Sequence, residues 1–512
     1  MNFKKLLSAA LAAVLLLTLT ACQPPQTGDG SGSQLPPPDA SGSAQQEDSS
    51  VPEALPPFAL AYAPDQSLHP VLSGSRTNLT LVPLLYEPLF ALDEHFQPQK
   101  VLCSDYSVSP DKLIWSFSIR PGVSFSNSTP LTGQIVAAAL EQARQPGSRY
   151  APRLRDVASI TADDNTVTVT LNRPNGRFHA LLDIPIALDG GANPAGTGPY
   201  VLFGSGADLA LAARMDWWQA DTVNVPAGKI PLHPIDNSDE LPFAFDAGDV
   251  GLVDVDLLAT DAKGFTSSCE TWDYATTDLL YLGFNTQKGV CRTPEVRRAI
   301  THAIDRKTVA QNIFATHAVP AALPVHPDSP LYDQALADTL NYDPQLVLEQ
   351  LQTANAQGRE LTMIVNAENY AKVGAAQMIS YQLQAAGISV NLQKLTFDAY
   401  QAALTAGSFD LYIGEVVLTA DFDLSPLLAA DGPLNYGGWT HPEAWYLFTS
   451  KAADLDNAPG AAAPLLKLIA QDVPIAPIVF KNGSALTQRG RLTGITPLRG
   501  NVFYQLQNWL IK

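Results

Sequence analysis

The sequence predicts an α/β protein, and the clearest sign is an alternation of strand and helix patterns late in the chain. Short apolar segments alternate there with longer segments whose apolar residues recur at helical spacing. In order, these are the strand 361–366, the helix 368–386, the strand 388–395, the helix 397–405 and the strand 409–417. Such alternation is typical of an α/β lobe. The part from Phe58 to Lys512 is too long for one simple core and predicts two or three subdomains.

The N-terminus predicts the cellular compartment. Residues 1–21 contain two early lysines, then a run of apolar or small residues that ends directly before Cys22. This run is short for a bilayer span, which needs about 20 apolar residues, and a Cys after small residues at a cleavage point accepts a diacylglyceryl group. We therefore expect a lipoprotein signal peptide over residues 1–21 and a lipid on Cys22. The alternative is an uncleaved transmembrane anchor.

Residues 22–57 are expected to form a disordered tether behind the lipidated Cys22. Beyond this cysteine they contain no aromatic residue, no Lys and no Arg, but many Pro, Gly and Ser residues. Such a composition cannot bury enough apolar surface to offset the ordering of the chain. A flexible coil of this length spans roughly 30 Å on average.

The middle of the chain carries further strand and helix signals. Residues 112–119 are predicted to form a strand, and residues 132–144 a helix capped by Thr132. Residues 166–171 alternate like a half-buried strand, and residues 276–285 are predicted to form a buried one.

A single helix is predicted over residues 294–314, beginning with a proline at its first position. Its apolar residues fall on one face, which predicts that this face is buried. They are Val296, Ile300, Ala303, Ile304 and Val309.

The charge balance excludes one class of partner. The chain has 31 basic and 50 acidic residues, a formal net charge of −19. Nucleic-acid binding needs a basic footprint, so we expect no nucleic-acid partner. The charge favours solubility but does not identify a ligand.

Three cysteines remain besides Cys22, namely Cys103, Cys269 and Cys291. Cys269 and Cys291 could close a loop by a disulfide in an oxidising compartment, which would leave Cys103 as a lone thiol. Three unpaired thiols are the alternative, because spacing alone does not show geometry.

The motifs of common enzyme classes are missing. The sequence contains no Gly-x-Ser-x-Gly, no His-Glu-x-x-His and no phosphate-loop motif, and its eight histidines lack the spacing of metal ligands. Asp421 and Asp423 follow the last predicted strand. Two such carboxylates lie roughly 7 Å apart along a strand and diverge in a turn, so they are not expected to share a proton or a metal. We expect no enzyme activity, no metal and no cofactor.

Several segments resemble the family 5 extracellular solute-binding proteins, which are the dipeptide, oligopeptide and nickel receptors of ABC importers. The resemblance covers nearly the whole chain from Phe58 and follows the family's order. The segments are 84–99, 110–132, 196–200, 281–306, 341–351 and 382–393. One departure is Leu418, which stands where an aromatic residue is common.

The resemblance implies a two-lobed, periplasmic-binding-protein-like clamp of type II and of the large peptide-binding class. Lobe one would comprise residues 58–82, 194–285 and 481–512, with an extra subdomain formed by residues 83–193. Lobe two would comprise residues 286–480. The chain would cross between the lobes at both ends of lobe two, and a ligand bound between the lobes would favour a closed form.

The resemblance also implies a ligand-binding site formed by Asp421, Phe422, Tyr436 and Trp439. Peptide-binding relatives carry an Ala-Asp pair where this chain has Ala420-Asp421, and the carboxylate pairs with the α-ammonium group of the ligand. The alternative is that Asp421 only caps the turn that follows it.

From the resemblance we expect a monomeric, lipid-anchored substrate-binding protein that captures short peptides and delivers them to the permease of an ABC importer. It would lie at the extracellular face of the cell membrane, or in the periplasmic space if the host has an outer membrane. One alternative is a receptor for a nickel chelate, a sugar or another small solute on the same fold. An alternative from another class is a lipid-anchored hydrolase.

Overall fold

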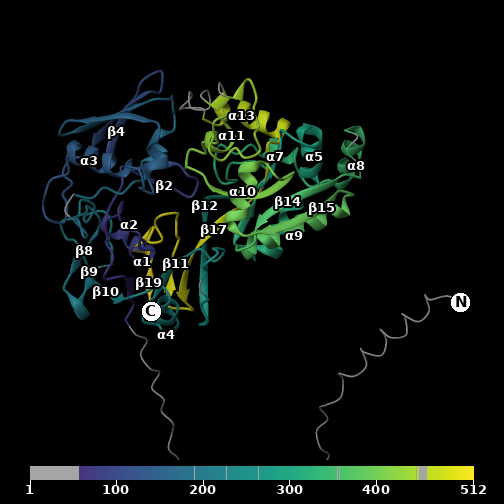
Figure 1. Cartoon of the computed structure of the whole chain (residues 1–512). Helices are drawn as coiled ribbons and strands as arrows, with labels where there is room; N and C mark the ends of the chain where they lie inside the picture. The colour runs from purple at the N-terminus through teal and green to yellow at the C-terminus, as the bar shows by residue number, and fades with distance from the viewer. Residues whose placement is uncertain are drawn as a thin grey trace, which may run out of the picture. The chain divides into compact units, whose positions relative to one another are not determined.

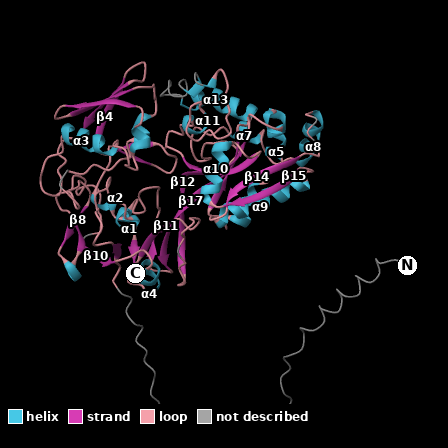
Figure 2. Cartoon of the chain, viewed as in Figure 1, coloured by secondary structure: helices cyan, strands magenta, loops and turns pink. Residues whose placement is uncertain are grey.

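An eleven-stranded sheet runs through the structure (Figures 1 and 2). Its strands follow the order β15-β14-β16-β12-β17-β11-β1-β10-β9-β8, and β13 pairs with β17 beside this path. The bounds are β1 Leu60–Tyr62, β8 Tyr200–Phe203, β9 Ala210–Ala213, β10 Lys229–Pro234, β11 Leu252–Val255, β12 Cys269–Phe284, β13 Ala318–Pro320, β14 Glu360–Asn366, β15 Ser389–Leu395, β16 Leu411–Val417 and β17 Ile475–Gln488. Helices accompany the sheet, so the predicted α/β class is confirmed.

The computed structural model describes residues 57–512 apart from 189–190, 227, 263, 355, 357, 445–446 and 449–457. The predicted signal peptide, Cys22 and all of the predicted tether except Pro57 lie outside the described residues.

Two long central strands, β12 and β17, connect the two predicted lobes. Strand β17 pairs with β11 through residues 484–487, whereas β12 pairs with β16 from Asp278 onward. The register between β12 and β17 shifts between Ala275 and Asp278. From Asp278 onward β12 also pairs with β16. The predicted crossing beside Phe480 lies near this point, and the one beside Asn285 lies at the far end of β12. The lobe boundaries themselves stay a prediction.

Predicted lobe two contains the strand and helix order expected from the sequence. Strand β14 pairs in parallel with both β15 and β16. Helices α9 (Tyr370–Ala385) and α10 (Phe397–Ala406) connect these strands. Buried residues of α9, such as Ile379 and Leu383, pack against Met363 and Val365 of β14. Figure 1 shows α9 lying along β14 and β15.

The single helix expected over residues 294–314 is wrong, because the structure contains two helices there. Helix α5 spans Pro294–His302 and α6 spans Arg306–Ile313. The side chain of Asp305 accepts a hydrogen bond from the backbone N–H of Thr308 at 3.1 Å, so it caps the start of the second helix. The predicted apolar face is nevertheless buried in the lobe core.

The predicted extra subdomain contains a second, antiparallel sheet of order β4-β5-β7-β6. Its strands are β4 Cys103–Val108, β5 Ile114–Ile119, β6 Val157–Ala162 and β7 Thr166–Leu171, and helix α3 spans Gly133–Ala143. The predicted cap of this helix is confirmed, since the Thr132 hydroxyl accepts from the N–H of Ile135 at 3.4 Å. The predicted alternation of residues 166–171 is confirmed by their burial. Trp115 and Phe117 of β5 lie in the core.

A hairpin of this subdomain reaches predicted lobe two. It consists of β2 (Phe90–Leu92) and β3 (Pro98–Lys100). Phe96, in the turn between the strands, is 2% exposed, and its ring centroid lies 5.5 Å from that of Phe422. The subdomain and lobe two therefore share part of one apolar core.

The other elements are further helices, of 4 to 15 residues, and one small sheet. Within the described residues, the remaining helices are α1 Arg76–Thr80, α2 Val82–Leu85, α4 Glu240–Ala247, α7 Gln334–Asp338, α8 Pro344–Thr353, α11 Ser425–Leu428 and α13 Ala458–Asp472. Near the C-terminus, β18 (Leu492–Thr493) pairs with β19 (Leu510–Ile511). The 3-10 turns are η2 Ala151–Leu154, η3 Phe178–Leu181, η4 Gly206–Asp208, η5 Val290–Arg292 and η6 Leu506–Asn508.

The disulfide between Cys269 and Cys291, one of the two alternatives from the sequence, is wrong. The three cysteines of the described residues are free. Strand β12 begins at Cys269 and extends for 16 residues, which is roughly 50 Å at about 3.3 Å per residue. A disulfide needs Cα atoms within about 7 Å. Burial raises the pKa of the Cys103 thiol to about 11 and that of Cys291 to about 12.

Candidate functional site

A cavity of about 670 Å³ lies beside the first helices, the extra subdomain and the C-terminal segment. We call it the large cavity. Its wall combines residues of α1 and α2, residues 149–153 and residues 498–507. A volume of this size suits a small-molecule or peptide ligand. The sequence did not indicate this site, because its walls come from segments far apart in the chain.

Four arginines line the large cavity, namely Arg76, Arg149, Arg153 and Arg499. Nη2 of Arg149 donates to the carbonyl oxygen of Ser73 at 2.6 Å. Arg153 forms an ion pair with Asp183, which also lies on the wall. Nη1 of Arg499 is buried and has no hydrogen-bond partner among the described residues.

Two carboxylates on the wall are engaged by other side chains. Glu87 accepts from Nε1 of Trp218 at 2.9 Å and from Nε1 of Trp217 at 3.2 Å. Burial raises the pKa of Glu87 to about 7, although these hydrogen bonds oppose the shift. Asp254 accepts from the hydroxyl of Tyr274 at 2.6 Å. The two tryptophans thus hold Glu87 in place.

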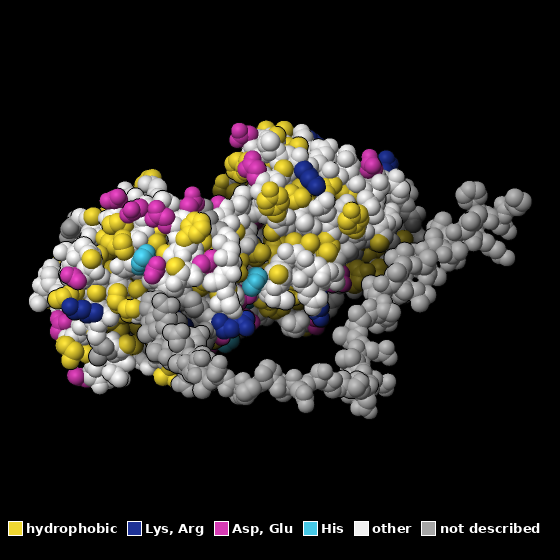
Figure 3. All heavy atoms as spheres, turned by 90° about the horizontal axis from the view of Figure 1, so that it is seen from below, with side chains coloured by type: hydrophobic (Ala, Val, Ile, Leu, Met, Phe, Trp, Pro, Cys, Tyr) yellow, Lys and Arg dark blue, Asp and Glu magenta, His cyan; other side chains and the backbone are white. Residues whose placement is uncertain are grey.

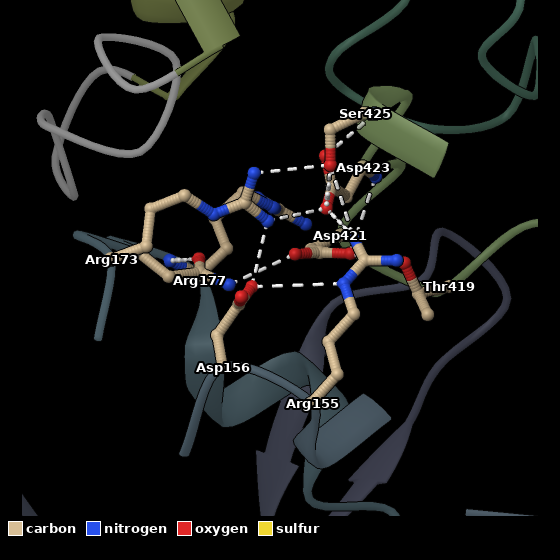
Figure 4. Close-up of polar contacts among 9 residues, drawn as sticks. Arg155, Asp156, Arg173, Arg177, Thr419, Asp421, Asp423 and Ser425 are labelled. Atoms are coloured by element: carbon tan, nitrogen blue, oxygen red, sulfur yellow. Dashed lines mark hydrogen bonds and ion pairs between the residues drawn. The ribbon is translucent and has the colours of Figure 1, made fainter. Parts of the chain in front are cut away.

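Asp421 lies where predicted lobe two contacts the predicted extra subdomain (Figure 4). Its Oδ2 accepts from Nδ2 of Asn175 at 2.9 Å, and its Oδ1 accepts from the hydroxyl of Thr419 at 2.6 Å. The same Oδ1 accepts from the backbone N–H of Asp423 at 3.3 Å, as the turn-capping alternative requires. Asp421 and Arg177 line a pocket of about 20 Å³, which is room for roughly one water molecule.

Asp423 is paired with arginines from the extra subdomain. Its carboxylate accepts from Arg173 at 2.9 Å and also from Arg155, and Asp156 accepts from Arg173 at 2.7 Å. The hydroxyl of Ser425 donates to Asp423 at 2.9 Å. Figure 4 shows these arginines directed at the carboxylates of the turn. Although no basic residue lies near Asp421 and Asp423 in the sequence, the fold supplies several.

The three predicted aromatic ligand contacts lie in or against the core of lobe two. Phe422 is fully buried, and Trp439 is 3% exposed with its Nε1 donating to Asp472 at 3.1 Å. Tyr436 is half-buried, and its ring centroid lies 6.3 Å from that of Tyr412. Neither these residues nor Asp421 line the large cavity. A ligand contact for them stays a prediction.

A cluster of charges lies where the two long strands change partners. Nζ of Lys481 lies 2.8 Å from Glu415, 3.1 Å from Asp278 and 3.3 Å from Asp256. Lys372 also pairs with Glu415. Burial and the neighbouring Glu415 raise the pKa of Asp278; the two lysines lower that of Glu415, although burial opposes this. The cluster joins strands of both predicted lobes, and sequence reasoning missed it.

Two further properties bear on the kind of site. Within the described ranges, no group of three or more His, Cys, Asp or Glu side chains is placed to hold a metal ion. Every helix of those ranges is too short or too polar to span a bilayer. On the face shown in Figure 3, the Lys and Arg side chains are scattered among acidic and apolar ones.

Residues 97–433 match the family model described as bacterial extracellular solute-binding proteins, family 5 Middle. The chain is similar to the oligopeptide-binding protein OppA of Bacillus subtilis, with 23% identity over 500 residues that cover 86% of this chain and 90% of OppA. It is also similar to the glutathione-binding protein GsiB of Escherichia coli, with 25% identity over 398 residues that cover 71% and 76% of the two chains.

A solved structure shows the same fold. It is that of MppA, a periplasmic murein tripeptide binding protein in an unliganded open form. The TM-score is 0.73 at 18% sequence identity, and the match covers 89% of this chain and 98% of MppA.

Proposed function

The chain belongs to the family 5 bacterial extracellular solute-binding proteins, and from this premise we propose that it is a lipid-anchored receptor that captures short peptides between two lobes and delivers them to the permease of an ABC importer. Its fold is the two-lobed α/β fold of this family, which consists of solute-binding receptors and not of enzymes. The observation that carries the proposal is the match of residues 97–433 to the model of this family. The names of OppA, GsiB and MppA support a peptide or peptide-like ligand.

Calorimetry and mass spectrometry test this proposal. The purified protein should bind peptides of two to five residues and rise in melting temperature with peptide concentration, because a ligand that binds only the folded state stabilises it. The peptides should be recovered intact. Recovery of hydrolysed peptide would favour the hydrolase, and co-purification of a metal chelate or a sugar without any peptide binding would favour a receptor for another solute.

Asp421 is proposed as the partner of the peptide's α-ammonium group. Its Oδ2 faces Asn175 of the extra subdomain, and an ammonium group with three donors could take the place of that amide. Asp421→Ala should then weaken peptide binding by about 3 to 5 kcal/mol. Asp398→Ala, an exposed carboxylate at the start of α10, is the matched control. Equal affinity for a peptide and its N-acetylated form would exclude this role.

The lipid on Cys22 is the second part of the proposal and rests on the sequence alone. Cys22→Ser should abolish acylation and leave the chain either uncleaved or released from the membrane. Intact-mass measurement of the protein from its native host checks this, and an unmodified Cys22 there would contradict it.

A further inference from the structure

Residues 256–260, directly after β11, connect predicted lobe one to predicted lobe two, and we call them the hinge strap. The carboxylate of Asp256 lies 3.3 Å from Nζ of Lys481 on β17. Leu258 packs against a core built mainly from predicted lobe two. The hydroxyl of Thr260 accepts from Nδ2 of Asn369 at 3.0 Å, and Asn369, which caps the start of α9, is 4% exposed. The strap is therefore fastened to the other lobe by one apolar and one polar contact, and to β17 by an ion pair.

The strap begins in the group of charges around Lys481, which we call the hinge cluster. Lys481 is buried, and its Nζ contacts Asp256, Asp278 and Glu415. Lys372 pairs with Glu415 from the side of α9. The five charged side chains thus come from the strap, β12, β16, β17 and α9. The cluster holds one more carboxylate than it holds lysines.

Asp278 is the member of the hinge cluster that keeps a proton most readily. Its Oδ1 is buried and has no hydrogen-bond partner among the described residues. A charge on such an oxygen is costly. Burial and the neighbouring Glu415 raise the pKa of Asp278, although Lys481 opposes the shift. With a proton on Asp278, two carboxylates face two lysines and the cluster is balanced.

The hinge cluster lies where the two predicted lobes can rotate against each other. The register between β12 and β17 shifts just before Asp278, and such an irregularity is a natural place for a bend. Asp256 approaches Lys481 from predicted lobe one, whereas Glu415 belongs to predicted lobe two. A rotation at this point therefore changes the distance between Asp256 and Glu415. Loss of the proton from Asp278 adds a third negative charge, and separating the carboxylates relieves their repulsion.

We propose that the hinge strap and the hinge cluster form a proton-controlled switch of the clamp, in which a proton on Asp278 favours the fastened strap and its loss favours an open clamp. Because the pKa of Asp278 is raised while the strap is fastened, fastening takes up a proton, and the stability it contributes is lost as pH rises through that pKa. A ligand that binds the closed clamp should therefore bind more weakly at alkaline pH. The inference goes beyond the proposed function, although its affinity measurement rests on that function.

Asp278→Asn tests the switch, because Asn is neutral at every pH and has the size of a protonated Asp. Alanine peptides of two to five residues are titrated by calorimetry into the wild type and this variant at about pH 6 and about pH 8. Between these values the affinity of the wild type should fall by about 3- to 10-fold relative to that of Asp278→Asn, because one proton is coupled to fastening. Comparing both proteins at the same pH cancels the titration of the peptide itself.

Lys372→Gln changes the charge of the hinge cluster in the opposite direction. It removes a lysine whose side chain is 23% exposed, so it should bind peptide more weakly than the wild type at about pH 8. Asp398→Asn, at an exposed position of α10, is the matched control and should follow the wild type. An affinity ratio of wild type to Asp278→Asn that is the same at both pH values would overturn the inference, as would unchanged binding by Lys372→Gln.

Failure of the proposed function gives a different result. If no peptide binds at either pH, the peptide function fails, and X-ray scattering of the empty protein decides the switch separately. A radius of gyration that is larger at about pH 8 than at about pH 6 in the wild type and Asp398→Asn, but constant in Asp278→Asn, would support the switch. No such difference between the proteins would overturn it.

Discussion

Replacing Glu87 with Gln should stabilise the protein at alkaline pH and change it little at acidic pH. Glu87 is 7% exposed, and burial raises its pKa from 4.5 to about 7. Between these values the folded protein holds a proton that the unfolded chain has released, so the free energy of unfolding falls as pH rises. The difference between the two pKa values corresponds to a loss of roughly 3 kcal/mol in the free energy of unfolding. Gln is neutral at every pH, and its oxygen can still accept from Trp218.

Urea unfolding of both proteins at about pH 5 and about pH 8, at one ionic strength, measures this effect. The variant Glu87→Gln should exceed the wild type in free energy of unfolding, and this difference should be larger at pH 8 than at pH 5 by about 2 to 3 kcal/mol. Glu349→Gln, at an exposed position of α8, controls for the loss of one negative charge. An advantage that is the same at both pH values would refute the argument, because Glu87 would then ionise alike in the folded and unfolded chains.

The remaining predictions concern the two charge clusters that join the parts of the structure. Asp423→Ala should lower the free energy of unfolding by about 1 to 3 kcal/mol, because it leaves partly buried arginines without their shared acceptor; a loss below about 0.5 kcal/mol in urea unfolding would contradict this. Lys481→Met should lower the free energy of unfolding by about 3 to 5 kcal/mol near pH 8, because three carboxylates lose their common partner. The loss should shrink near pH 5 as Asp278, whose pKa is raised, takes up a proton; an equal loss at both pH values would count against this account.

The sequence predicted a helix or strand correctly where neighbouring residues alone determine it. The Thr132 cap and the alternation of residues 166–171 depend on neighbours within a few positions, and both are confirmed. The break between α5 and α6 was missed because the apolar face continues through it. Asp305, followed by Thr308 three positions later, was the available signal, since Asp is a favoured cap residue.

The sequence by itself determined the family, the α/β class and the order of elements, because these depend on patterns within one segment or on many segments in a known order. Only the tertiary structure decided which charges meet. Arg155 and Asp423 are 268 positions apart, and Arg499 reaches the wall of a cavity formed largely by residues from the first half of the chain. Such contacts arise from how the subdomains pack, and each side chain alone resembles an ordinary surface charge. These charge contacts therefore became visible only in the fold, where long-range packing brings distant side chains together.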